Sequence, residues 1–199
     1  MKDKFKPNND CSIDKYQVQS PAGVWNVEEC NQGLHWVKLG PEQSKDIYTD
    51  VDVKAVEDIK LKTPLINWMK VYFEDAEKVQ RYPLPTVCPQ VFVKDGFREK
   101  VWREIYHNLS FGEIATYGDV AKRCGSEKAS QVTIYFLLCN IMSLCQAVGT
   151  AMRTNPISLV IPCHRVVKAG GSPGHYSGGN RDYLKIWLLK HEENHLIRD

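Results

Sequence analysis

The chain has 199 residues, a length that suits one large domain or two small ones, and 43% of them are hydrophobic, enough for a core. The formal net charge is only +2, so any nucleic-acid binding must come from a local basic patch. No apolar run reaches the ~18 residues of a membrane span, and no signal-peptide pattern follows the charged N-terminus, so we expect no membrane partner. Seven cysteines in such a chain predict a reducing compartment, where thiols serve catalysis or metal binding.

Three strands are predicted near the N-terminus. Residues 15–20 and 24–28 flank Pro21-Ala22-Gly23, which is typical of a hairpin turn. Residues 34–39 alternate apolar and polar side chains, as a third strand does, and Gly40-Pro41 ends them.

Two helices and a domain boundary follow these strands. The apolar spacing predicts helices at 51–60 and 64–74, the second with Pro64 at its first position. The proline-rich stretch 82–85 is the best candidate for a boundary between two domains.

The second half is predicted to be helical. Helices are expected at 97–108, at 117–124 between a Thr116 cap and Gly125, and at 181–193. Another helix, capped by Ser126 or Ser130, is expected to end near 154–156. Together with 117–124 and its short glycine turn, it suits a helix-turn-helix. Positive charge there fits either phosphate contact or a solvated helix face; it comes from Lys122, Arg123, Lys128 and Arg153.

Cys163 and His164 are the most informative pair in the chain. They follow Pro162 at the end of the apolar run 157–161, so the backbone before the thiol is stiff. A histidine is the usual neighbour that activates a cysteine thiol. For the pair alone, a buried, inert cysteine beside a surface histidine is the favoured interpretation, because buried free cysteines are common. The glycine-rich segment 170–179 predicts a loop that could approach a ligand closely.

Five segments, in order, resemble the O6-alkylguanine-DNA alkyltransferases, also called methylated-DNA–protein-cysteine methyltransferases, over nearly the whole chain and in the animal form. They are Phe111-Gly112-Glu113 with Tyr117, Asn155-Pro156, Pro162-Cys163-His164-Arg165-Val166, Tyr176-Ser177-Gly178-Gly179, and Trp187-Leu188-Leu189 with His191-Glu192. The resemblance implies an α+β fold. Residues 1–88 would form an α/β domain with a small antiparallel sheet of the ribonuclease H-like kind. Residues 89–199 would form a helical, winged-helix-like domain with the helix-turn-helix.

The resemblance also implies an activity and a set of roles. The Cys163 thiolate would take the alkyl group from O6-alkylguanine, and from O4-alkylthymine as a further substrate, in duplex DNA. The thioether is stable, so each molecule reacts once, as a suicide enzyme without an organic cofactor. His164 would take the thiol proton through a water, and Glu192 would orient it. Tyr117 would rotate the nucleotide out of the stack. The remaining substrate-binding positions are Asn155, Val166 (through its carbonyl), Tyr176, Ser177 and Lys185.

The residues alone favour a solvated helix end for Glu192, and only the resemblance reverses that preference. Tyr117 and Tyr176 could be ordinary core aromatics. We expect the protein to be a monomer, and to lie in the nucleus, with a cytoplasmic pool allowed, because its substrate is DNA.

A structural zinc site is the second implication. Cys11, Cys30 and His35 follow the spacing of the animal family, and Cys88 stands where the family has a histidine. Cysteine preserves the ligand chemistry, so these four residues could hold zinc in a tetrahedron. The alternative is three buried thiols beside a surface histidine.

The chain departs from the family at two places. The arginine that fills the gap left by the flipped base is replaced by Gln131 or Gln146, which lacks the charge and the stacking plane of arginine. With Tyr117, Lys128 and Arg153, these are the expected DNA contacts. Residues 132–146 have no counterpart, are almost wholly apolar, and would lengthen the recognition helix. Our hypothesis is that they come from a translated intron or a splice variant, which would leave the protein inactive.

Two further readings are open. A non-catalytic binder of alkylated DNA would need no thiol, so Cys163 argues against it. A cysteine hydrolase would need turnover and a distant histidine that this chain does not clearly supply.

Overall fold

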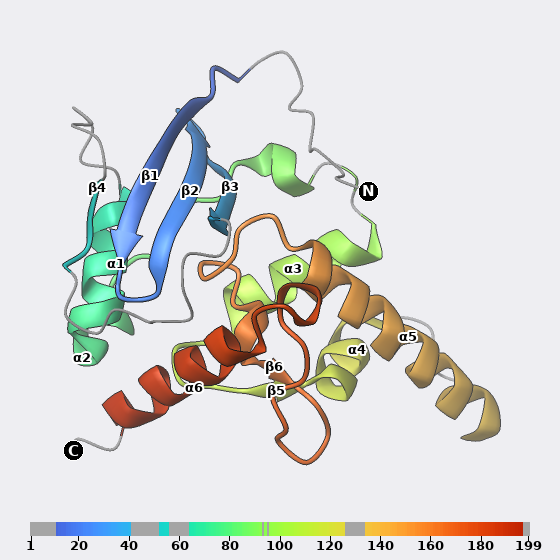
Figure 1. The fold of residues 1–199 in the computed structure, drawn as a ribbon. Coiled ribbons are helices and arrows are strands. Elements are labelled where there is room, and N and C mark those ends of the chain that lie inside the picture. The colour runs from blue at the N-terminus through green and yellow to red at the C-terminus, as the bar shows by residue number, and fades with distance from the viewer. Residues whose placement is uncertain are drawn as a thin grey trace.

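A computed structural model describes residues 11–40, 52–55, 64–92, 94, 96–125 and 134–196. A small antiparallel sheet occupies the N-terminal half (Figure 1). Its strands are β1 (Asp14–Ser20), β2 (Gly23–Cys30), β3 (Gly33–Leu39) and β4 (Lys54–Ala55), in the order β3-β2-β1-β4. The three predicted strands are confirmed. The turn between β1 and β2 requires a positive φ of 110° at Gly23, a value that glycine adopts readily.

The predicted helix at 51–60 is wrong where the structure describes it. Lys54 and Ala55 form β4, which pairs with β1 through Val18↔Ala55 and Gln19↔Lys54. The sequence there also alternates, with Val51, Val53 and Ala55 at every second position, and the edge of β1 offers backbone groups that a strand can pair with. Residues 51 and 56–60 lie outside the described part of the chain.

Helix α1 (Pro64–Glu74) matches its predicted bounds and covers the sheet. Its buried side chains recur at the spacing of one helix face; they are Leu65, Ile66, Trp68, Met69, Tyr72 and Phe73. A short helix, α2 (Ala76–Val79), follows and was not predicted; the Asp75 side chain caps it by accepting from the Lys78 N–H at 3.1 Å.

The C-terminal half is mainly helical, as predicted. It contains α3 (Phe97–Asn108), α4 (Tyr117–Gly125), α5 (Ile134–Thr154) and α6 (Asp182–Leu196), with a short 3-10 helix at Pro89–Phe92 before α3. The predicted Thr116 cap is confirmed: its hydroxyl accepts from the Asp119 N–H at 3.1 Å, and the Asp119 carboxylate accepts from the Thr116 N–H at 3.0 Å. A two-stranded parallel pair was missed, β5 (Ala115–Thr116) with β6 (Val166–Val167). It brings the start of α4 beside the segment that follows Cys163.

Helix α5 is one continuous helix of 21 residues, about 31 Å long. Its first part consists of 134–146, so the unmatched segment extends the helix rather than forming a separate loop. Its N-terminal end reaches away from the rest of the described chain (Figure 1). Leu144, at the middle of α5, packs against Gly125 at the end of α4. A Cβ at position 125 would come within 2.7 Å of Leu144 Cδ1. Helices α4 and α5 pack on each other, but residues 126–133 between them are outside the described part, so the helix-turn-helix stays a prediction.

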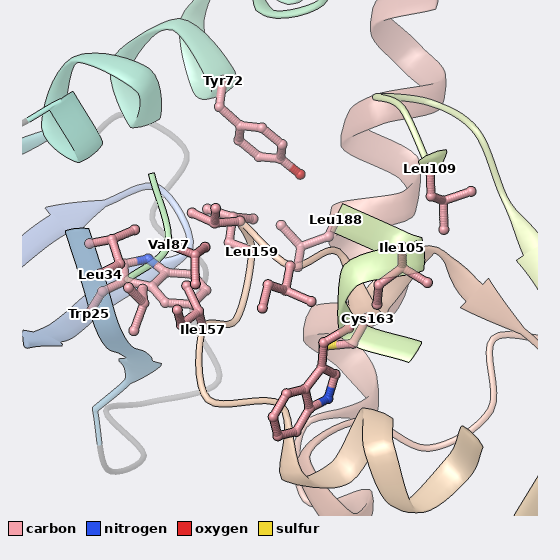
Figure 2. Packing of buried hydrophobic residues seen from close by; sticks show 14 of the residues in the cluster. Trp25, Leu34, Tyr72, Val87, Ile105, Leu109, Ile157, Leu159, Cys163 and Leu188 are labelled. Atoms are coloured by element: carbon pink, nitrogen blue, oxygen red, sulfur yellow. The ribbon is translucent and has the colours of Figure 1, made fainter. Parts of the chain in front are cut away.

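The two halves share one hydrophobic core. Figure 2 shows Trp25 and Leu34 of the sheet packed beside Ile157 and Leu159 of the segment that leads to Cys163. The backbone of Val37 in β3 is hydrogen-bonded to that segment, with its N–H donating to Pro156 O at 3.0 Å and its carbonyl accepting from Ser158 at 2.9 Å. The sheet therefore supports the reactive segment directly. The domain boundary at residue 88 stays a prediction. Among the described residues, no helix is long and apolar enough to cross a membrane.

Candidate active site

Cys163 lies at the end of a rigid, buried segment. Ile157, Leu159 and Ile161 are almost fully buried, and Ile161 N–H donates to Ile157 O at 2.9 Å. Leu159 has a φ of 75°, a left-handed conformation that a leucine keeps only when its surroundings fix it. Cys163 itself is 4% exposed and begins a short 3-10 helix, Cys163–Arg165. The thiol is therefore held on backbone that has little freedom to move.

Asn155 fixes the turn before this segment, as the resemblance implies. Its side chain is fully buried, donates from Nδ2 to Ile161 O at 2.8 Å, and accepts from the Ile157 N–H at 3.0 Å. One side chain thus ties both ends of the run that precedes Cys163.

His164 and Glu192 form a buried pair. His164 is 0% exposed, and its Nε2 lies 2.7 Å from Glu192 Oε1. Because a carboxylate accepts, Nε2 carries the proton and Nδ1 is the basic nitrogen. Nδ1 is buried, and none of the described residues hydrogen-bonds to it. The pair therefore has the geometry of a base and the group that orients it.

Arg165 and Tyr72 complete the surroundings of Glu192, and neither was predicted to have a role there. The Arg165 guanidinium donates from Nε to Oε2 at 2.9 Å and from Nη2 to Oε1 at 3.0 Å, and its Nη1 donates to Leu109 O at 2.8 Å. The Tyr72 hydroxyl donates to Oε1 at 2.7 Å and the Gly112 N–H to Oε2 at 3.0 Å. Glu192 is thus a buried carboxylate surrounded by donors. Arg165 belongs to the motif Pro162-Cys163-His164-Arg165-Val166, so the sequence did point to its neighbourhood. Tyr72 looks in the sequence like any other buried aromatic residue of α1.

These contacts decide which groups are charged. Burial alone would raise the pKa of Glu192, but His164 and Arg165 outweigh it and lower that pKa well below its usual range. Burial lowers the pKa of His164, and Glu192 offsets only part of the effect. At neutral pH the site therefore holds an anionic Glu192 and a neutral His164.

A cavity of about 720 Å³ opens beside the thiol. Its wall includes Cys163 and five positions predicted to bind substrate or DNA, which are Tyr117, Gln146, Arg153, Tyr176 and Ser177. His175, which was not predicted, also lines it. Burial raises the pKa of Tyr117, and it raises that of Tyr176 well above its ordinary value, with the nearby Cys163 contributing to both shifts. Both phenols therefore stay neutral and can donate hydrogen bonds into the cavity.

Lys185 lies behind this wall. It is 1% exposed and donates from Nζ to Val166 O at 2.6 Å, so the carbonyl expected to accept from the substrate already accepts from a lysine. Its Nζ also lies 5.9 Å from the centre of the Tyr117 ring. Burial lowers the pKa of Lys185 to about 8. Gln146 and Arg153 are exposed on α5, whereas Gln131 and Lys128 lie outside the described residues.

A second cluster lies at the far end of the sheet. One ligand atom from each of Cys11, Cys30, His35 and Cys88 lies within 4.8 Å of the other three. Tetrahedral zinc with ligands at about 2.3 Å would hold sulfur atoms about 3.8 Å apart, so the set is compact enough to hold a metal and is compatible with zinc. The four residues predicted from spacing are thus brought together. Cys124 and Cys145 lie elsewhere and are half-buried.

Comparison with known proteins decides the family. Residues 96–194 match the model of the 6-O-methylguanine DNA methyltransferase DNA-binding domain. The chain is 33% identical over 193 residues to methylated-DNA–protein-cysteine methyltransferase of Homo sapiens, covering 95% of this chain and 84% of the relative. It is 37% identical over 180 residues to the enzyme of that name from Methanosarcina mazei, covering 90% and 96%. The chain belongs to the methylated-DNA–protein-cysteine methyltransferase family.

Solved structures agree with the fold of this family member. The crystal structure of Mycobacterium tuberculosis OGT in complex with DNA superposes with a TM-score of 0.60 at 23% identity, covering 91% of this chain and 93% of that one. The mixed α+β class with a small antiparallel sheet is confirmed. The residues matched by the family model, 96–194, include Cys163, His164 and Glu192. A non-catalytic binder is not favoured, since the curated relatives are named as methyltransferases.

Proposed function

We propose that the protein repairs alkylated DNA by moving the alkyl group from guanine O6 to Sγ of Cys163. The observation that carries this is the buried thiol at the wall of the cavity, next in sequence to a histidine that a carboxylate orients. The Cys163 thiolate forms the new S–C bond, the C–O6 bond breaks, and its electron pair passes to guanine, which takes up a proton. The product is a thioether that nothing in the site hydrolyses, so one molecule repairs one base.

His164 accepts the thiol proton at Nδ1. Burial keeps the imidazole neutral at rest, and Glu192 holds the proton at Nε2, so the nitrogen able to act as base is defined. None of the described residues hydrogen-bonds to Nδ1, so a water molecule can bridge Nδ1 and the thiol and carry the proton between them.

The substrate base enters the cavity from duplex DNA. An alkylated O6 lies within the base stack, so the nucleotide must be flipped out to reach Cys163. Neutral phenols of Tyr117 and Tyr176 can donate to the leaving guanine as negative charge builds on it. Arg153 on α5 and Lys168 at the cavity rim supply positive charge for the backbone. O4-alkylthymine presents the same alkyl–oxygen bond and is the second substrate that we propose. Because the substrate is DNA, we also propose that the protein acts in the nucleus, with a cytoplasmic pool allowed.

Intact-mass spectrometry after incubation with O6-methylguanine duplex DNA tests this function. We expect each molecule to gain the mass of one CH2 on Cys163 and no more, however much DNA is added. Unmodified duplex is the control. A variant lacking 132–146, run in parallel, separates the chemistry from the effect of the extension: an adduct only in the shortened protein would mark the long form as inactive. No adduct in either would refute the proposed function.

We further propose that Cys11, Cys30, His35 and Cys88 bind one structural zinc ion. Zinc would be present at one ion per chain by elemental analysis, and removing it with a chelator would lower the melting temperature, because folding and metal binding are coupled. Cys88→His should keep the metal and Cys88→Ala should lose it. Cys124→Ala, which removes a half-buried thiol elsewhere, is the matched control and should leave the zinc content unchanged. Metal-free protein with an unchanged melting temperature would contradict the proposal.

A further inference from the structure

Tyr72 joins the N-terminal half to the reactive centre through two consecutive residues of α6. Its hydroxyl donates to Glu192 Oε1 at 2.7 Å, and its backbone carbonyl lies 2.9 Å from His191 Nε2. The side chain is fully buried. Its ring is held by neighbours at centroid distances of 5.1 Å, 4.9 Å and 5.5 Å, contributed by Trp68, Phe73 and Phe111. The packing around the ring therefore fixes the position of the Tyr72 hydroxyl.

We infer that Tyr72 is a positioning residue for the alkyl transfer, acting through Glu192 on His164; this inference rests on the proposed function. Tyr72 shares Oε1 with His164 Nε2 and with Arg165 Nη2, so the same oxygen that orients the base also accepts from the tyrosine. Helix α1, remote in sequence from the thiol, thereby contributes to the chemistry.

The shared oxygen sets the direction of the effect. A donor on Oε1 disperses the negative charge of the carboxylate, which weakens its stabilisation of a protonated His164. Without the tyrosine hydroxyl, Glu192 stabilises the imidazolium more strongly, and His164 takes up a proton at higher pH. A protonated His164 cannot accept the thiol proton, so transfer slows most at acidic pH. Two other charged groups act on His164, and both lower its pKa: Arg165, its neighbour in sequence, and Lys185 on α6. Tyr72→Phe leaves both of them in place.

Tyr72→Phe tests the inference, because it removes only the hydroxyl. We expect transfer to slow roughly tenfold near pH 6 and roughly twofold near pH 8.5, so that the acidic limb of the rate profile moves to higher pH. Tyr106→Phe is the matched control: it removes a hydroxyl that donates to Pro85 O at 3.1 Å, far from Glu192, and should leave the profile unchanged. In a Glu192→Gln background, Tyr72→Phe should have little further effect.

A direct titration separates this inference from the proposed function. Imidazole NMR of His164 reports its protonation without any alkyl transfer, and Tyr72→Phe should move that titration to higher pH. If Tyr72→Phe fails to fold, 3-fluorotyrosine at position 72 keeps the packing and makes a stronger donor, which should move the titration to lower pH. An equal loss of rate at all pH values with an unmoved His164 titration would overturn the inference. Failure of wild-type transfer with a moved titration would instead refute only the proposed function.

Discussion

Replacing Cys163 with serine is expected to abolish alkyl transfer and to leave the fold intact. Serine is nearly the same size, so the buried position is preserved, but its hydroxyl ionises far less readily than a thiol and attacks saturated carbon poorly. The imidazole of His164 is too weak a base to remove the proton from a serine hydroxyl. We expect no adduct by intact mass, with a melting temperature close to that of the wild type.

Cys145 gives a sharp control for this experiment. It lines the same cavity, so among the described residues it is a second thiol that a bound alkylated base could meet. Cys145→Ser should transfer the alkyl group as the wild type does. An adduct mapped to Cys145 in the Cys163→Ser variant would contradict the assignment of Cys163 as sole acceptor.

Replacing Glu192 with alanine is expected to have the largest effect on stability. It leaves the buried Arg165 without its carboxylate and His164 without an orienting partner, a change that typically costs about 3–5 kcal/mol. Transfer by the folded fraction should fall by roughly 10²–10⁴-fold, since the base is no longer held. Glu193→Ala, an exposed neighbour on the same helix, is the control and should change neither the unfolding midpoint nor the rate. Chemical denaturation and single-turnover labelling measure the two effects.

The same carboxylate predicts how stability depends on pH. The pKa of Glu192 is lower in the folded chain than its ordinary value of 4.5, so its contribution is complete above that value and is lost as the pH falls towards the folded pKa. His164 acts in the same direction, because burial lowers its pKa from 6.5 and the unfolded chain binds the proton more readily. The free energy of unfolding should therefore decline on acidification below about pH 6.5 and more steeply below about pH 4.5. In Glu192→Gln the steeper decline should be smaller.

The sequence predicted the elements whose signals are local. The turn residues Pro21-Ala22-Gly23 marked β1 and β2, and alternation marked β3. Pro64 marked the start of α1, and Thr116 with Gly125 marked α4. Each of these signals depends on residues within a few positions. The prediction failed at β4, where two residues are strand only because the edge of β1 lies beside them. The β5–β6 pair was missed for the same reason, since its partners are far apart in the chain.

The site was predictable to the same extent. Cys163 and His164 are adjacent in sequence, so the pair could be singled out from the residues alone. The role of Asn155, which ties down the run before Cys163, came from the resemblance. Glu192 was found only through the resemblance, as a helix end looks the same whether solvated or buried. Tyr72 has the pattern of any core aromatic on α1, and its distinction is a hydroxyl contact across 120 residues of chain. No local rule encodes such a contact.

The unbroken length of α5 has a consequence for how DNA is held. A helix that begins near a phosphate offers it free N–H groups and the positive end of its dipole. Here the helix begins at Ile134, twelve positions and about 18 Å before Gln146 at the cavity wall, so that positive end is displaced from the base being repaired. From Ile134 to Met152 the helix carries no ionisable lysine, arginine, aspartate or glutamate. We expect side chains, above all Arg153 and Lys168, to neutralise the phosphates near the cavity instead. The DNA affinity should then fall steeply with ionic strength, and replacing either residue with alanine should make that fall less steep.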